Sequence, residues 1–284
     1  MLEIKNLTYR IKKKSVIEDV SYYFMPGVYG LLGPNGAGKT TIMRCITGVY
    51  SLKQPAIFYD GEEAIKNKNF LNIISYLPQE FGLFKDLKVK EMMLMLASLR
   101  GVKTKSDLKL VESCLELVNL SDKINDKVRT LSGGMIRRLG IAQTLLNDPK
   151  IIIFDEPTAG LDIEERLRFK NIISEIRKDR VIIISTHIAT DIESLCDQVL
   201  VMNEGKVIFT GSCEQVANQA NHKGYILPED KLASIEGKYH IQNYFEKDSK
   251  NFTKIVSHLR IDDSDIECVE PTIEDGYICL IKEI

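Results

Sequence analysis

The segment that most constrains the fold is a glycine loop between a strand-like run and a helix-like run. The apolar run at residues 28–33 ends in glycine, and residues 38–49 have apolar side chains at helical spacing. The loop GPNGAGKTT, residues 33–41, fits the pattern G-x-x-x-x-G-K-[ST], in which glycines let backbone N–H groups curl around phosphate oxygens. A strand, a glycine loop and a helix in this order predict an α/β fold with a nucleotide phosphate site.

Two further runs, at residues 150–157 and 180–187, are apolar on both faces, as covered strands of a parallel sheet are. Between them, residues 163–178 have the pattern of an amphipathic helix. Strand, helix and strand in this order predict a right-handed crossover in a parallel sheet. Other strands are predicted at residues 2–11, 16–24 and 73–79, a hairpin at 198–211, and helices at 90–100, 105–118 and 133–146.

The character of the chain changes at residue 213. Residues 213–224 are polar and predict a connector, and the remainder mixes strand-like pieces at 238–245 and 266–271 with one predicted helix at 251–259. A chain of 284 residues is long for one simple domain. We therefore predict a main domain over residues 1–212 and a compact C-terminal accessory region over residues 213–284.

Two acidic residues follow the strand at 150–157, at the edge where ligands of such sheets bind. Asp155 is expected to hold Mg²⁺ through water, and Glu156 to polarise a water for attack on a γ-phosphate. Solvated acids in an ordinary turn are the alternative, which a phosphate loop in the same sheet disfavours. In that loop Lys39 is placed to reach the β- and γ-phosphates, and the Thr40 hydroxyl to ligate Mg²⁺.

The amino-acid composition gives no support for direct binding to nucleic acid, metal clusters or membranes. A net charge of −2 and a pI near 6.2 give no general attraction to nucleic acid or anionic lipid. The six cysteines include no CxxC pair and no nearby histidine at metal-ligand spacing, which is typical of reduced thiols in a cytosolic protein. No signal-peptide core opens the chain, and its apolar runs fall far below the ~18 residues that span a bilayer. We expect a soluble chain that reaches a membrane only through a partner.

The motifs together resemble those of the ATP-binding cassette (ABC) ATPases over residues 1 to 212. LSGG, residues 131–134, is that family's most discriminating element. The resemblance implies an α/β phosphate-loop ATPase core with a mostly parallel sheet, an antiparallel β subdomain and a helical signature subdomain, to which this chain adds a small α+β C-terminal appendage. The motifs that carry it are GPNGAGKTT, YLPQE, LSGGMIRR, IIIFDEP, AGLD and STHI, in the family's order and spacing.

The resemblance also assigns roles to single residues. Tyr9 matches an aromatic that stacks on adenine, although a tyrosine in a strand is otherwise more often simple packing. Gln79 matches the glutamine that touches Mg²⁺ and the attacking water, His187 a histidine at the γ-phosphate, and Asp162 an aspartate facing the opposite subunit. The implied catalytic residues are Glu156, His187, Gln79 and Lys39; the nucleotide contacts Tyr9, Asn35, Gly36, Gly38, Lys39, Thr40, Thr41, Ser132, Gly134 and Asp162; and the Mg²⁺ residues Thr40, Gln79 and Asp155.

In this family two ATPase domains pack head to tail, and each ATP lies between the phosphate loop of one chain and the signature of the other. Ser132 and the backbone at Gly133 and Gly134 would grip a γ-phosphate held by a second chain, whose own Lys39 supplies the lysine. One cassette in the chain therefore implies a dimer with an identical or paralogous ATPase subunit.

Details of the sequence resemble one branch of the family. Met135, where many relatives have glutamine, and the segment EPTIEDGYICL at 270–280 are similar to subunits of ABC-2-type exporters of drugs, lantibiotics and bacitracin. That branch implies a separate transmembrane subunit and a cytoplasmic location on the inner face of the cell membrane. SLKQPAIFYDG, residues 51–61, departs from the family in lacking a glycine before the strand.

Two alternatives remain beside a transport subunit. A soluble cassette protein acting on ribosomes or DNA is disfavoured, because such proteins carry two cassettes or a long coiled coil, and no basic patch suggests nucleic acid. A regulatory cassette without hydrolysis is disfavoured because Glu156 and His187 are both present.

Overall fold

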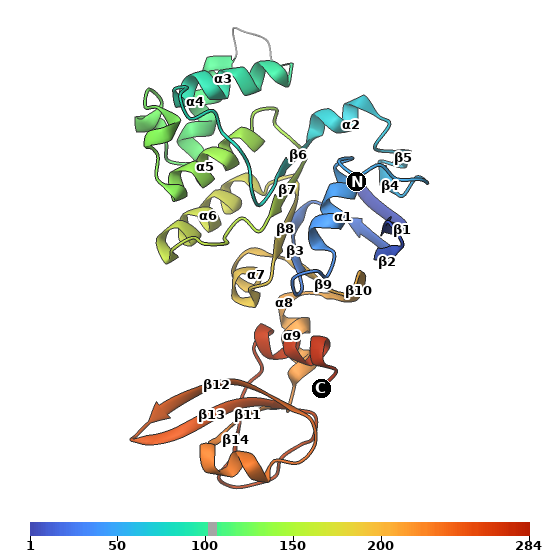
Figure 1. Ribbon diagram of the computed structural model, residues 1–284, viewed down its shortest axis with the longest axis vertical. Helices are drawn as coiled ribbons and strands as arrows, with labels where there is room; N and C mark the ends of the chain where they lie inside the picture. The colour runs from blue at the N-terminus through green and yellow to red at the C-terminus, as the bar shows by residue number, and fades with distance from the viewer. Residues whose placement is uncertain (102–106) are drawn as a thin grey trace.

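The computed structural model describes residues 1–101 and 107–284, which form a six-stranded central sheet and two four-stranded sheets (Figure 1). The strands of the central sheet are β3 (Gly27–Leu32), β6 (Ile74–Leu77), β7 (Ile151–Asp155), β8 (Val181–Thr186), β9 (Gln198–Asn203) and β10 (Lys206–Gly211). They lie in the order β10-β9-β3-β8-β7-β6, and only the β9–β10 pair is antiparallel. The predicted parallel sheet and the hairpin at 198–211 are confirmed.

Helices cover both faces of the central sheet because its strands are apolar on both. Ile151 and Ile153 of β7 face the core that contains α1 (Lys39–Ile46), while Ile152 and Phe154 face the core that contains α5 (Gly133–Thr144) and α6 (Ile163–Ile176). The short helix α7 (Ala189–Leu195) follows β8. Alternate residues of one strand therefore hold two helical layers in place.

A helical subdomain packs beside the sheet and contains α5. It is built from α3 (Val89–Leu99), α4 (Asp107–Leu117), η1 (Ser121–Lys123) and η2 (Val128–Thr130). The predicted helix at 90–100 is confirmed within one residue at each end. Of the helix predicted at 105–118, residues 105 and 106 lie outside the described part of the chain.

An antiparallel sheet lies beside the phosphate loop. Its strands are β1 (Leu2–Ile11), β2 (Lys14–Phe24), β4 (Ile57–Tyr59) and β5 (Glu62–Glu63), in the order β2-β1-β4-β5. The helix α2 (Lys68–Ile73) leads from this sheet into β6. The strands predicted at 2–11 and 16–24 are confirmed, and with them the antiparallel β subdomain.

The third sheet belongs to the C-terminal region, and it corrects one prediction. Its strands are β11 (Gly224–Pro228), β12 (Tyr239–Lys247), β13 (Lys250–Ser257) and β14 (Glu267–Cys268), with η4 (Glu229–Ser234) between the first two. The helix predicted at 251–259 is wrong, because this segment is β13 at the centre of the sheet, paired with β12 and β11. Its apolar spacing also fits a helix, but the β-branched Thr253, Ile255 and Val256 are fully buried between two neighbouring strands.

The connector predicted at 213–224 is also wrong in part. Ser212 caps α8 (Cys213–Ala217) in a capping box with Gln215, and η3 (Asn218–Ala220) follows. Val216 of α8 and Ala220 of η3 are buried, so each of these short helices places an apolar side chain in the interior.

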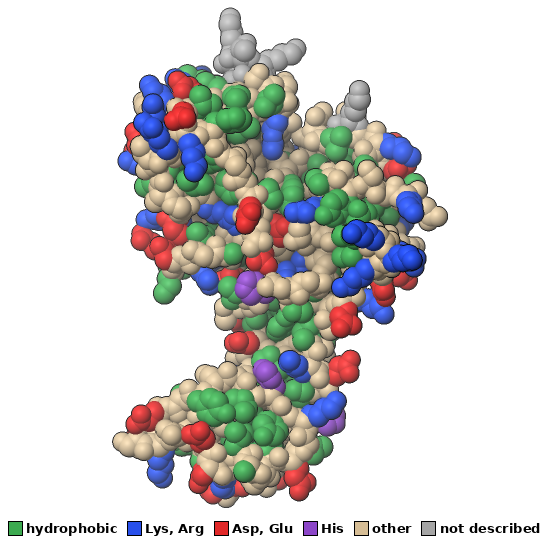
Figure 2. Space-filling model, viewed as in Figure 1, with side chains coloured by type: hydrophobic (Ala, Val, Ile, Leu, Met, Phe, Trp, Pro, Cys, Tyr) green, Lys and Arg blue, Asp and Glu red, His purple; other side chains and the backbone are tan. Residues whose placement is uncertain are grey.

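The last helix, α9 (Ile273–Lys282), returns to pack on α8 and α7. A narrow waist joins the C-terminal sheet to the main body (Figure 2). No helix in the described part of the chain combines the length and apolar character that crossing a bilayer requires.

Candidate functional site

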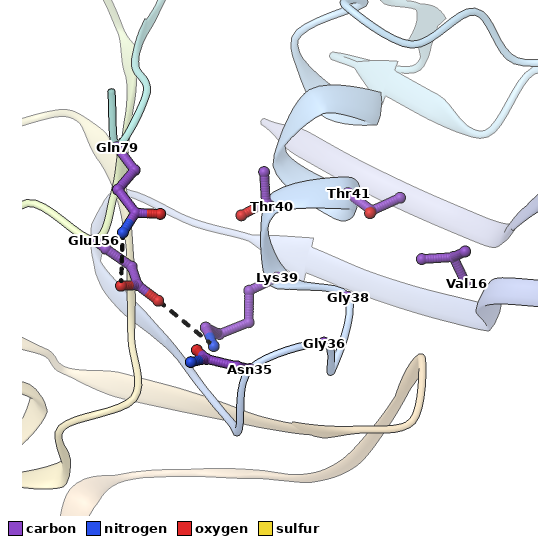
Figure 3. A pocket seen from close by; sticks show the side chains of 9 residues that line it. All are labelled: Val16, Asn35, Gly36, Gly38, Lys39, Thr40, Thr41, Gln79 and Glu156. Carbon is purple, nitrogen blue, oxygen red and sulfur yellow. Dashed lines mark hydrogen bonds and ion pairs between the residues drawn. The ribbon is translucent and has the colours of Figure 1, made fainter. Parts of the chain in front are cut away.

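The glycine loop lies between β3 and α1 and opens on a cavity of about 210 Å³ (Figure 3). Gly36 and Gly38 adopt φ angles of 83° and 105°, which L side chains rarely adopt. Gly38 is the N-cap of α1, so the free N–H groups and positive dipole end of the helix face the cavity. Its lining residues are Val16, Asn35, Gly36, Gly38, Lys39, Thr40, Thr41, Gln79 and Glu156.

Lys39 is held over the loop by backbone acceptors. Its ammonium group donates to the carbonyl oxygens of Gly33 at 2.7 Å and Pro34 at 3.1 Å, and its side chain is 5% exposed. Burial lowers the pKa of Lys39, while the charges of Glu156 and Asp155 oppose that shift. Two carbonyl oxygens therefore fix the Lys39 side chain beside the glycine loop, where the sequence predicts phosphate binding.

Asp155, at the end of β7, is buried, and both of its carboxylate oxygens accept hydrogen bonds. Its Oδ1 accepts hydrogen bonds from the Ser185 hydroxyl at 2.7 Å and the Thr40 hydroxyl at 3.2 Å, and its Oδ2 accepts from the Tyr76 hydroxyl at 3.1 Å. Burial, followed by the charge of Asp155, raises the pKa of Tyr76 to about 12, so this phenol stays a donor near neutral pH. Sequence reasoning missed Tyr76 and Ser185, although each lies within three residues of a predicted site residue.

Glu156 points into the cavity from a strained turn. Its φ angle is 45°, a conformation that costs a non-glycine residue about 1–3 kcal/mol and persists where surrounding contacts impose it. Its carboxylate lies 3.4 Å from Gln79 Nε2, 3.4 Å from His187 Nδ1 and 3.9 Å from Lys39 Nζ. Figure 3 shows Gln79 and Lys39 on two sides of this carboxylate. The four residues predicted to be catalytic therefore meet at one point.

Oxygen donors suited to magnesium lie beside this point. The Thr40 hydroxyl and the Asp155 carboxylate are in hydrogen-bond contact, and Gln79 brings an amide oxygen to the same cavity. Magnesium prefers such hard oxygen ligands and keeps several waters, so few protein ligands suffice. Within residues 1–101 and 107–284, no cluster of three or more histidine, cysteine or acidic side chains offers a competing metal site.

The residues predicted to face a second subunit do not line this cavity in their own chain. Ser132 is exposed and caps α5, its hydroxyl accepting from the Met135 N–H at 3.2 Å. Asp162 likewise caps α6, accepting from the Glu165 N–H at 2.8 Å. Gly134 packs against the side chain of Glu165. None of Ser132, Gly134 and Asp162 lines the cavity that holds Lys39.

Tyr9, the predicted adenine contact, is half-buried and stacks on another tyrosine. Its ring lies 5.1 Å from that of Tyr50 and parallel to it, which leaves only the opposite ring face for a further stack. Val16, on the neighbouring strand β2, does line the cavity. Sequence reasoning also missed Arg137, which donates to the backbone carbonyls of Gln79, Glu156 and Pro157.

Comparison with known proteins matches residues 17–159 to the family described as ABC transporter. The chain is 36% identical over 213 residues to the uncharacterized ABC transporter ATP-binding protein YhcH of Bacillus subtilis, covering 73% of this chain and 68% of that protein. It is 32% identical over 240 residues to MJ1023 of Methanocaldococcus jannaschii, described in the same words, covering 84% and 87%. It is 35% identical over 214 residues to the Nod factor export ATP-binding protein I of Burkholderia lata, covering 74% and 70%.

Solved structures give the same result for the fold. An ATP-binding subunit of an ABC transporter superimposes with a TM-score of 0.68 at 26% identity, covering 77% of this chain and 92% of that one. CbiO1 of Clostridium perfringens, part of the ABC transporter complex CbiONQ, also gives 0.68 at 26% identity, covering 76% and 89%.

Proposed function

The chain belongs to the ATP-binding proteins of ABC transporters, and from this membership we propose that it is the ATPase subunit of an ABC-2-type exporter. Subunits of this family dimerise and work with membrane subunits. The export assignment is supported by the signature LSGGM, by the segment 270–280, and by the similarity to the Nod factor export ATP-binding protein I. The proposed location is the inner face of the cell membrane, where a separate transmembrane subunit holds the chain.

The surroundings of Glu156 carry the proposal of hydrolysis. In the proposed mechanism, the γ-phosphate lies beside Lys39 and the N–H groups of the glycine loop. Glu156 accepts a proton from a water that attacks the γ-phosphorus, while the bond to the bridging β–γ oxygen breaks and ADP leaves. Gln79 and His187, each 3.4 Å from the Glu156 carboxylate, would orient that water and the γ-phosphate. Magnesium, held by Thr40, Gln79 and, through water, Asp155, would offset the phosphate charge.

The separation of loop and signature supports a shared site. Small-molecule pockets usually enclose about 300–1,000 Å³, whereas the cavity in one chain is about 210 Å³ and open to solvent. Ser132 and Gly134 belong to another surface of the chain, so they are free to complete the site of a second subunit. A head-to-tail dimer would then contain two complete sites.

Two variants test the shared site because they damage opposite halves. Lys39→Ala removes the loop cation and Ser132→Arg blocks the signature, so each alone should lose at least about 10²-fold in ATPase rate. An equal mixture should recover about a quarter of wild-type activity, since about half of its dimers are mixed and each mixed dimer has one intact site. Full activity of Ser132→Arg alone would mean that LSGGM serves only as a helix cap, and it would overturn the proposal of a shared site.

Cell fractionation tests the transport role. If a neighbouring reading frame encodes a transmembrane protein, the chain should sediment with membranes when the two are co-expressed, and that protein should co-purify with it in detergent. Sedimentation with ribosomes, unchanged by the membrane protein, would favour the soluble alternative and contradict the exporter assignment.

A further inference from the structure

Arg137 connects the signature helix to the loops that carry the catalytic side chains. The signature helix is α5 with its cap Ser132, and Arg137 lies in its second turn. Its guanidinium donates to the carbonyl oxygens of Gln79 at 2.7 Å and Pro157 at 2.9 Å, and also to that of Glu156. Three backbone carbonyls from two loops, distant in sequence, therefore meet on one planar cation.

The fork shape of arginine explains why this residue type serves here. A guanidinium presents several N–H donors in a fixed plane, whereas a lysine ammonium is a point charge on a flexible stem. The Arg137 guanidinium also lies 5.8 Å from the centre of the Phe81 ring, in the loop that follows Gln79. Burial lowers the pKa of Arg137, and the charges of Asp155 and Glu156 oppose that shift.

The adjacent arginine has a different set of contacts. Arg138 donates to Glu165 at 3.1 Å and to the carbonyls of Val118 and Asn119 at 2.8 Å, so it joins α5 to α6 and to the end of α4. Arg138 thus fastens helices to one another. Arg137 is the member of the pair that reaches the hydrolytic site.

The Arg137 contacts help to hold the strained backbone of Glu156. With φ at 45°, Glu156 needs contacts that hold its backbone in place, and its carbonyl is one of the Arg137 acceptors. The Glu156 N–H is held from the other side by the Ser185 hydroxyl at 2.9 Å. Loss of Arg137 leaves the direction of the Glu156 side chain less restricted.

We propose that Arg137 is a positioning residue that holds the backbones of Gln79 and Glu156 in fixed relation to the signature helix of the same chain. The inference rests on the proposed function, because it assumes that Gln79 and Glu156 serve ATP hydrolysis. In the head-to-tail dimer, the helix that grips the partner's ATP would thereby be joined to the groups that act on its own chain's ATP.

The first test separates catalysis from binding in the homodimer. Arg137→Met should lower kcat by about 10–100-fold, the scale of a catalytic group misplaced by an ångström, with the Kd for ATP changed less than about threefold. Arg137→Lys, which keeps the charge but cannot span three carbonyls, should recover part of that loss. Arg129→Met is the matched control, since Arg129 is an exposed arginine just before the signature that pairs with exposed Asp86 at 3.7 Å. Its kcat should equal that of the wild type.

The second test uses mixed dimers with one intact site. In a mixture of Lys39→Ala and Ser132→Arg chains, the Ser132→Arg chain supplies the intact loop and its catalytic residues. Adding Arg137→Met to that chain should lower the recovered rate by about 10–100-fold. Adding it to the Lys39→Ala chain, which supplies only the intact signature, should leave the rate within about threefold.

The outcomes separate this inference from the proposed function. A kcat for Arg137→Met equal to that of Arg129→Met, or an equal loss in both mixed-dimer arms, would overturn the positioning role and leave the ATPase assignment intact. A wild-type chain without ATPase activity would instead contradict the proposed function. If Arg137→Met folds poorly, the kcat of the Arg137→Lys homodimer is compared with that of the wild type instead. An unchanged kcat in Arg137→Lys also overturns the positioning role of Arg137.

Discussion

At the scale of single residues, two neighbouring carboxylates are given different chemistry by the groups around them. Asp155 is 2% exposed and accepts three hydrogen bonds, so its position is defined on every side. Glu156 turns out of the strand into the cavity, where its side chain is 13% exposed and lies within 4 Å of two cationic or potentially cationic groups. The buried carboxylate is suited to a fixed structural or metal-holding role, and the accessible one to proton transfer.

Glu156→Gln should separate ATP binding from hydrolysis. The amide keeps the size of the side chain but cannot take a proton, so turnover should fall by about 10²–10⁴-fold while ATP still binds. Size-exclusion chromatography with ATP and Mg²⁺ should show an accumulated dimer. Glu80→Gln, at the exposed position after Gln79, is the control that keeps the wild-type rate. Wild-type turnover in Glu156→Gln would remove Glu156 from the proposed role.

Tyr76→Phe should weaken the response to magnesium. The change removes the hydroxyl that donates to Asp155 Oδ2 at 3.1 Å and leaves the ring in place. Loss of such an outer partner of a metal ligand typically costs about 10–100-fold in metal affinity, so the Mg²⁺ concentration for half-maximal ATPase rate should rise by that factor. Tyr23→Phe, at an exposed position, should leave the titration unchanged. An unaltered Mg²⁺ titration in Tyr76→Phe would argue against Asp155 as a magnesium residue.

At the scale of elements, the segment 270–280 joins the helices α8 and α9 to the C-terminal sheet. Thr272 caps α9 in a capping box with Asp275, and the buried Asp275 carboxylate accepts from Lys254 of β13 at 2.9 Å and from Gln242 of β12. Gly276, next along the helix, lies against the backbone carbonyl of Val216 in α8. A motif read from sequence as the mark of a family branch thus has a packing role in this chain.

Gly276→Ala should loosen this junction. A Cβ at this position would collide with the Val216 carbonyl, and backbone moves less readily than a side chain. Overpacking of this kind costs about 1–3 kcal/mol, more than the helix propensity that alanine adds. The lower stability should appear as faster limited proteolysis near residues 213–224. Glu274→Ala, an exposed change on the same helix, is the control, and equal proteolysis of the two variants would contradict the tight junction.

At the scale of the whole molecule, residues 213–284 pack against helices and strands of the preceding part of the chain. Val216 of α8 and Ile273 of α9 pack in one cluster with Leu32 at the end of β3, Ile192 of α7 and Val199 of β9. We propose that residues 1–212 bind ATP without help from residues 213–284, although the two parts share this apolar contact. Every residue that lines the cavity beside Lys39 lies before residue 157.

Truncation after Gly211 tests that division. ATP should still bind, because all the lining residues remain, but the exposed faces of α7 and β9 should lower the thermal midpoint by about 10 °C. Calorimetric titration with ATP measures binding, and thermal unfolding measures the midpoint, for the full chain and for the truncated chain. A truncated chain that is folded but does not bind ATP would place the domain boundary elsewhere.

The sequence by itself determined the central sheet and the chemistry at its edge. The glycine loop, the buried strand that ends at Asp155, and the helix predicted at 163–178 and observed at 163–176 depend on backbone freedom and apolar periodicity. Neighbours in the chain encode both properties. Motif order was sufficient to predict the family, and the structure brings Lys39, Gln79, Glu156 and His187 together as expected.

Only the tertiary structure decided the features that depend on segments far apart in the chain. The segment 251–259 has spacing suited to a helix, yet it is a strand because β12 and β11 satisfy its backbone and bury its β-branched residues. Ser185 and Tyr76 donate to Asp155, which lies 30 and 79 residues away in the chain. Arg137 donates to backbone carbonyls that lie 19 to 58 residues away. Such contacts arise from packing, because a side chain's donors do not specify which distant acceptor the fold will bring to them.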